Sequence, residues 1–218
     1  MRRIATLVVA ALVLLPPAAL RAQLPDARQV AQERARAELE VPQLAALLEL
    51  RPGMTVADVG AGFGATTVVM AKSIGNGKVF ATDVGQRQLQ AIRDYIERET
   101  LTNVTVLEGA AAATNLPAAC CDAIFMRDVY HHVTDVDAFN TSVLASLKPG
   151  GRFAVLDFVP RAGSALPEGV RANRGGHGIS TAIVVEELTA AGFTHLQTFD
   201  KWPPDDKSAG LFLVLFRK

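Results

Sequence analysis

The sequence has few cysteines and no excess of charge of either sign. Its 22 Lys and Arg residues balance 22 Asp and Glu residues, so the basic face that nucleic-acid binding requires is not expected. Cys120 and Cys121 are adjacent, which excludes a disulfide framework between distant segments, and they lack the spacing of a zinc site. We interpret them as small buried residues at the start of a strand, with a vicinal disulfide or a redox role as the alternative. No metal site is predicted.

Internal repeats and long charged runs are also missing. The 17 Gly and 11 Pro residues follow no fixed period, which excludes fibrous and repeat architectures. Hydrophobic residues make up 50% of the chain, which is too much for an intrinsically disordered protein. With 218 residues the chain is long enough to form one domain with a substantial core.

The first 22 residues have the pattern of a secretory signal peptide. Two arginines precede a short apolar run over 4–15, prolines follow at 16–17, and the small residue Ala22 stands at the expected cleavage point. The run is shorter than the roughly 20 residues of a membrane span. We therefore predict a periplasmic or secreted protein with no stable membrane span after cleavage. An uncleaved signal that anchors the protein to the membrane is the alternative, because Leu20 is bulky for its position.

Beyond the signal peptide, helical and strand patterns alternate along the chain. Residues 23–50 have helical periodicity, and Pro42 is predicted to start a second short helix there. Predicted strands lie at 55–59, 78–83, 104–108, 123–126, 152–158, 194–199 and 211–217. Helices separate most of them, but none separates the last two. This order predicts an α/β domain over 51–218, with a doubly wound, mostly parallel sheet and one antiparallel strand near the C-terminus.

A glycine-rich turn joins the first of these strands to a helix. It comprises residues 58–64, Asp-Val-Gly-Ala-Gly-Phe-Gly, in which glycines allow a tight turn and a close approach of ligand to backbone. Asp83 ends the second strand, where a carboxylate can bind both hydroxyls of a ribose. The turn and Asp83 together predict a site for an adenosine-containing cofactor. Residues 60–65 also fit the G-x-G-x-x-A pattern, which leaves an NAD(P)-dependent oxidoreductase as one alternative.

Further segments match the order of motifs in a known family. They include Val-Tyr-His-His-Val at 129–133 and Leu-Lys-Pro-Gly-Gly at 147–151, and the others lie at 50–53, 108–110, 115–117 and 122–125. With the turn and Asp83, these segments resemble the class I S-adenosylmethionine-dependent methyltransferases, especially the ubiquinone/menaquinone C-methyltransferase-like branch. The resemblance spans about 44–218 and implies a Rossmann-like sheet of seven strands.

The resemblance also implies an activity and a cofactor site. The activity is transfer of a methyl group from S-adenosylmethionine to a small-molecule acceptor by in-line displacement; a catalytically inactive cofactor-binding protein is the other alternative. Ala110 stands where the family often has an acid for the adenine amino group, so a backbone contact or another side chain must replace it. The implied cofactor-binding residues are Asp58, Gly60, Ala61, Gly62, Gly64, Asp83, Gly109, Ala110 and Arg127.

Candidates for the acceptor side follow the fourth and fifth strands. A general base is needed where the acceptor must lose a proton early, and we predict Asp128 and His131 as catalytic residues and Tyr130 as an acceptor contact. In the alternative, His131 and its neighbour pack against the following loop. Arg174 and His177 belong to a glycine-rich loop that borders the acceptor site in this fold, and we predict that they bind an anionic acceptor. A solvated surface loop is the alternative there.

Overall fold

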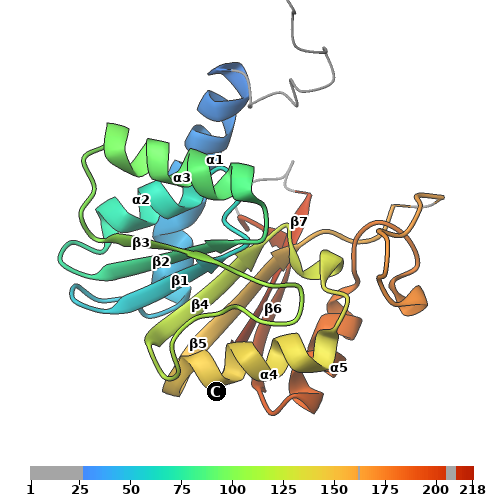
Figure 1. The fold of residues 1–218 in the computed structure, drawn as a ribbon. Coiled ribbons are helices and arrows are strands. Elements are labelled where there is room, and N and C mark those ends of the chain that lie inside the picture. The colour runs from blue at the N-terminus through green and yellow to red at the C-terminus, as the bar shows by residue number, and fades with distance from the viewer. Residues whose placement is uncertain (1–26, 162, 205–209) are drawn as a thin grey trace, which may run out of the picture.

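The computed structural model describes residues 27–161, 163–204 and 210–218. They form a seven-stranded sheet of order β3-β2-β1-β4-β5-β7-β6 (Figure 1). The strands are β1 (Thr55–Val59), β2 (Lys78–Asp83), β3 (Val104–Glu108), β4 (Cys121–Arg127), β5 (Leu147–Asp157), β6 (Thr194–Trp202) and β7 (Leu211–Arg217). All neighbours are parallel except the pairs that β7 makes with β5 and β6. The predicted α/β fold is confirmed, and the predicted signal peptide lies outside the described residues.

The described residues form five α-helices that cover both faces of the sheet (Figure 1). They are α1 (Ala27–Leu47), α2 (Ala65–Ser73), α3 (Gln86–Arg98), α4 (Val136–Ser146) and α5 (Thr181–Ala190). Because side chains alternate along a strand, Val56 of β1 packs in one core with α1 and α2, and Ala57 packs in the other with α4 and α5. None of these helices combines the length and apolar character needed to cross a bilayer.

The first helix corrects one prediction. Pro42 does not start a second helix; it lies inside the single helix α1. Ala37, Val41, Leu44 and Leu48 are buried at spacings of three and four residues on both sides of the proline, and the last three pack in the α1–α2 core. Burial of this continuous face compensates for the backbone hydrogen bond that a proline cannot donate.

The start of β4 corrects a second prediction. Cys120 and Cys121 form a vicinal disulfide, which is the alternative to the interpretation as free thiols. Cys121 is fully buried, as expected for the first residue of a strand in the core. Its strand neighbour Leu147 begins β5 earlier than the predicted residue 152, so residues 147–151 belong to an irregular first part of β5.

Candidate functional site

A cavity of about 780 Å³ opens at the carboxyl ends of β1, β2 and β4. This is the edge at which open parallel sheets bind ligands, and the volume lies in the usual range for small-molecule sites. The cavity wall includes all nine predicted cofactor-binding residues except Gly64, together with Asp128. Side chains of α1, Glu33 and Arg36, form a further part of the wall that the sequence did not predict.

The glycine-rich turn after β1 is held by its own backbone. The amides of Gly60 and Ala61 both donate to the carbonyl oxygen of Thr82, at 2.8 and 2.9 Å. Gly60 has a φ of +76°, and a Cβ there would lie 2.6 Å from two methyl carbons of Val129. A Cβ on Gly62, by contrast, would meet nothing within 4 Å. The turn thus packs tightly against the loop after β4 and leaves open space above Gly62.

Asp83 at the end of β2 connects this turn to the next loop. Its Oδ2 accepts a hydrogen bond from the Gly62 amide and its Oδ1 one from the Gly85 amide, both at 2.9 Å. Each carboxylate oxygen keeps a free lone pair, because an ionised carboxylate can accept about four hydrogen bonds. The carboxylate is therefore fixed in orientation and can still bind two hydroxyl groups. The backbone amide of Gly109, after β3, donates to the backbone carbonyl oxygen of Asp83 at 2.9 Å. This bond holds the loop after β3, which forms part of the cavity wall, next to the end of β2.

Asp58 at the end of β1 is buried and only 2% exposed. Thr67 Oγ1 donates a 2.6 Å hydrogen bond to its Oδ2. Burial raises the pKa of Asp58 to about 7, and the nearby Asp83 charge adds to this rise, whereas the hydrogen bond from Thr67 opposes it. A cation in the cavity would favour the ionised form of this carboxyl group.

Arg127 at the end of β4 makes a bidentate ion pair with Glu40 of α1. Arg127 Nε and Nη2 donate to the two Glu40 oxygens at 2.7 and 3.0 Å, and the Glu40 side chain is only 3% exposed. The pair fastens α1 against the sheet beside the cavity. Glu40 was not identified from the sequence as the partner of Arg127, because no motif marks a single acid in a helical segment 87 residues away.

Asp128 follows Arg127 and turns the chain away from β4. It has a φ of +62°, and its amide donates to the Leu156 carbonyl at 2.8 Å. Partial burial raises the pKa of Asp128, and the nearby Asp157 charge raises it further. Asp128 lines the cavity together with the predicted cofactor-binding residues.

His131 is 1% exposed, and the carboxylate of Asp157 holds its ring in place. Nδ1 of His131 lies 2.8 Å from Asp157 Oδ1, and the backbone amide of His131 donates to Oδ2 at 3.0 Å. The other ring nitrogen, Nε2, lies 3.1 Å from Nε2 of His177. His132 lines the cavity, and partial burial together with the charges of its two histidine neighbours lowers its pKa. The structure thus brings the predicted residues His131 and His177 together beside the cavity.

Tyr130 and Arg174 differ in position from the prediction that they contact the acceptor. Both are fully buried and share Glu187 of α5 as a partner: Tyr130 Oη donates to it at 3.1 Å and Arg174 Nη1 at 2.8 Å. Neither residue lines the cavity. For Tyr130 the reason is the short 3-10 helix η2 (Tyr130–His132). Successive side chains of such a helix point about 120° apart, and that of Tyr130 points into the core.

Comparisons with known proteins agree with this geometry. Residues 56–151 match a family described as a methyltransferase domain. The chain is 34% identical over 110 residues to the ubiquinone/menaquinone biosynthesis C-methyltransferase UbiE of Shewanella halifaxensis (strain HAW-EB4), a match that covers 50% of this chain and 44% of that relative. It is 28% identical over 192 residues to the methyltransferase GfsG of Streptomyces halstedii, covering 87% of this chain and 64% of that protein.

A solved structure extends the likeness to nearly the whole chain. A SAM-dependent methyltransferase from Aquifex aeolicus superimposes with a TM-score of 0.68 at 26% sequence identity. The match covers 89% of this chain and 99% of that one. This chain spans less than half the length of the UbiE relatives it matches. The shared part contains the glycine-rich turn, Asp83 and the end of β4, which are the elements that form the cavity.

Proposed function

We propose that this chain is a class I S-adenosylmethionine-dependent methyltransferase and that it transfers a methyl group from that cofactor to a small-molecule acceptor. Its likeness to methyltransferases in sequence and fold supports the proposal. The observation that carries the proposal is the cavity at the strand ends, where Asp58 and Asp83 flank an open glycine turn. When bound, S-adenosylmethionine supplies a methyl group activated by a sulfonium cation. The chain's own residues must bind the cofactor, align the acceptor and exclude water.

The residues at the ends of β1 and β2 fit the polar ends of the cofactor. Asp83, already oriented by two backbone amides, would accept the two ribose hydroxyls. The open space above Gly62 gives room for the chain of atoms between ribose and methionine. Asp58 would attract the positively charged methionine part, and ionisation of its carboxyl group is then favoured. The backbone at Gly109 and Ala110 would border the adenine.

The acceptor side would be formed by α1 and by the loop after β4. Glu33 and Arg36 of α1 face the same cavity as Asp128 and His132, so a small acceptor can lie between them. Of the two predicted catalytic residues, Asp128 faces the cavity directly. His131 faces His177 and would act on a proton only through its histidine neighbours. Asp128 is therefore the better candidate for a base that contacts the acceptor.

Calorimetric titration with S-adenosylmethionine, S-adenosylhomocysteine and NADP tests this function. We expect micromolar binding of the first two ligands and none of NADP. Binding of NADP alone would contradict the proposal and favour the oxidoreductase. Binding of the methyl donor, followed by no transfer of labelled methyl to any member of a panel of phenols, thiols, amines and quinols, would favour an inactive cofactor-binding protein.

We also propose that the protein is exported to the periplasm or secreted. The charged, apolar and small-residue order of residues 1–22 supports this location. Mass spectrometry of the protein from separated cell fractions tests it: a mature chain that starts at Gln23 outside the cytoplasm is expected. An intact N-terminus in the membrane fraction would favour the anchored alternative.

A further inference from the structure

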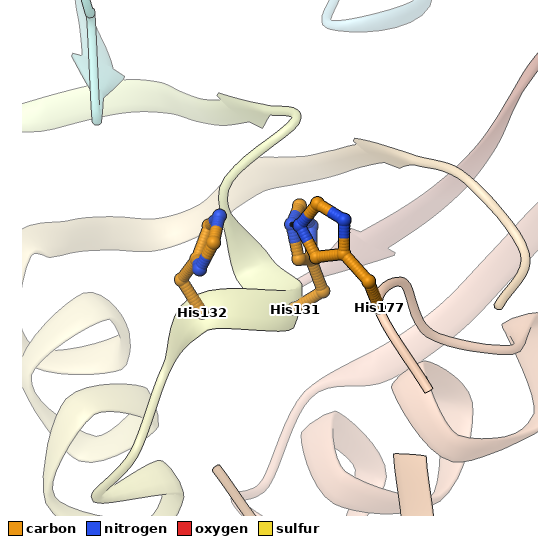
Figure 2. A group of neighbouring side chains, drawn as sticks. All are labelled: His131, His132 and His177. Atoms are coloured by element: carbon orange, nitrogen blue, oxygen red, sulfur yellow. Dashed lines mark hydrogen bonds between the residues drawn. The ribbon is translucent and has the colours of Figure 1, made fainter. Parts of the chain in front are cut away.

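Three of the four histidines of this chain form a cluster beside the cavity. His131 and His132 come from η2, and His177 comes from the loop before α5 (Figure 2). One ring nitrogen from each residue lies within 4.8 Å of the other two. The ring centroids are 4.0 Å apart for His131 and His132 and 4.8 Å apart for His131 and His177.

The central ring, His131, has its orientation and tautomer fixed. Asp157 accepts hydrogen bonds from the backbone amides of His131 and Phe158, at 3.0 and 2.8 Å, as suits an ionised carboxylate. Because such a carboxylate is only an acceptor, Nδ1 of His131 must carry the proton in their 2.8 Å contact. With the proton on Nδ1, Nε2 is the ring nitrogen whose lone pair can bind a cation, and it faces His177.

The gap between the two facing nitrogens matches a shared cation. Nε2 of His131 and Nε2 of His177 are 3.1 Å apart, and two imidazoles this close need a proton or a metal ion between them. Zn–N bonds of about 2.0–2.1 Å in a tetrahedral site separate two ligand nitrogens by about 3.3 Å. A ring nitrogen of His132 lies within 4.8 Å of a ring nitrogen of each of the other two histidines.

We propose that His131, His132 and His177 bind a divalent transition-metal ion, with Zn²⁺ as the best-matched ion. Imidazole ligands suit zinc, and three of them with one open position form the arrangement found in catalytic zinc sites. Asp157 behind His131 supplies the outer-shell carboxylate that typically orients a histidine ligand. A second group of ligand atoms, from Asp128, His131 and Asp157, also lies within 4.8 Å and provides negative charge beside the cation.

The open position would face the cavity, because His132 forms part of its wall. If the proposed methyl transfer is correct, the metal selects the class of acceptor: a small molecule with an oxygen or sulfur donor, such as a phenol or thiol. A cation in contact with that donor stabilises its deprotonated, nucleophilic form. The metal site itself does not depend on the transferase activity and is tested separately.

The test uses the full chain, freed of metal with a chelator and titrated with Zn²⁺ in the absence of any methyl donor. We expect one equivalent to bind, with a rise in melting temperature as the ion stabilises the folded state. Replacing Zn²⁺ by Co²⁺ should give the visible absorption bands of a tetrahedral nitrogen-ligated ion. No stoichiometric binding would overturn the proposal and leave the His131–His177 contact as a hydrogen bond.

Variants assign the ligands. His132→Ala and His177→Ala change side chains that are not fully buried, so the protein should still fold, and each should weaken Zn²⁺ binding by about 100-fold or more. Asp157→Asn should weaken it by about 10–100-fold, as loss of an outer-shell partner does. His195→Ala is the matched control: His195 is exposed on β6, and its ring bonds to Thr198 rather than to the histidine cluster, so affinity should not change. Equal affinity in His177→Ala and the parent protein would show an adventitious ion and overturn the site.

Binding of S-adenosylhomocysteine by the same metal-free protein separates this proposal from the proposed function. Unchanged cofactor affinity with no metal binding would overturn the metal site alone. Metal binding with no cofactor binding would contradict the methyltransferase function and leave the metal site standing.

Discussion

The two halves of the cavity are constructed in different ways. On the proposed cofactor side, residues 58–85 bond among themselves: the backbone amides of Gly60 and Ala61 donate to Thr82, and those of Gly62 and Gly85 donate to Asp83. On the proposed acceptor side, side chains from distant parts of the chain bond to one another, as His131 does with Asp157 and His177. The cofactor side is therefore encoded locally, and the acceptor side depends on how the helices dock.

This difference predicts that mutations in the two halves have separate consequences. A change on the cofactor side should reduce cofactor affinity with little loss of stability, because the backbone network remains. A change in a buried side-chain network should reduce stability first, because it leaves charges without partners. Variants in each half can establish or refute this separation.

The largest effect is expected for Glu187→Gln, in the network behind the acceptor side. Arg174 is fully buried, and its Nη1 forms an ion pair with Glu187 at 2.8 Å, whereas its Nε and Nη2 have no hydrogen-bond partner among the described residues. Removing the carboxylate charge should lower the free energy of unfolding by about 3–5 kcal/mol, measured by urea denaturation. Glu186→Gln, on the exposed side of α5, is the matched control and should have almost no effect. An equal loss in both variants would contradict the buried ion pair.

Asp83→Ala should have the next largest effect, and on binding rather than stability. It removes the acceptor of two cofactor hydroxyls and frees the amides of Gly62 and Gly85 from their shared partner. Loss of about 3 kcal/mol, or about 100-fold in affinity for S-adenosylhomocysteine, is expected by calorimetry. Asp94→Ala removes an exposed acid from α3 and serves as the control. Unchanged affinity in Asp83→Ala would remove Asp83 from the cofactor site.

Gly60→Ala should test the contact between the two halves. The added Cβ would press on the Val129 methyl carbons at 2.6 Å, and the overpacking should cost about 2 kcal/mol beyond backbone strain. Gly75→Ala is the control, since Gly75 also has a positive φ but open space around it. The double variant Gly60→Ala with Val129→Ala should recover part of the lost stability in thermal melts. Equal destabilisation by the two single variants would mean that the close approach has no energetic importance.

The same contrast explains what the sequence could predict. The glycine turn and Asp83 follow consecutive strands of the chain, so their position depended only on the alternation of strands and helices, which the structure confirms. The resemblance to S-adenosylmethionine-dependent methyltransferases followed from the same residues, and the comparisons agree with it. These features need only local geometry and the rule that parallel strands end at one edge.

The acceptor side could not be predicted in the same way. Tyr130 and His131 are adjacent in sequence, yet one enters the core and the other faces His177, because a single turn of 3-10 helix separates their directions. The histidine cluster joins residues 46 positions apart, and no local spacing marks it. Pro42 was misinterpreted because burial against the sheet stabilises the helix that contains it. Local helix propensity gives no information about that burial.

The smallest predicted effect concerns the pH dependence of cofactor binding. With the pKa of Asp58 at about 7, its carboxyl group is mostly protonated at pH 6 and mostly ionised at pH 8. A cationic ligand prefers the ionised form, so affinity for S-adenosylmethionine should rise by about tenfold between these values and level off above them. In the free protein the sign is opposite, because the native state holds this proton more tightly than the unfolded chain does, and stability falls as pH rises from about 4 to 7.

Asp58→Asn separates this carboxyl group from every other titrating group, including those of the ligand itself. The variant keeps an oxygen that can accept the bond from Thr67, so the turn should stay in place while the titration disappears. Calorimetry at pH 6, 7 and 8 should then give a nearly flat affinity, lower than that of the parent protein at pH 8. A slope equal to the parent's would place the titrating group elsewhere. Asp58 would then support the turn rather than contact the cofactor, and Asp83 would be the acidic residue that binds it.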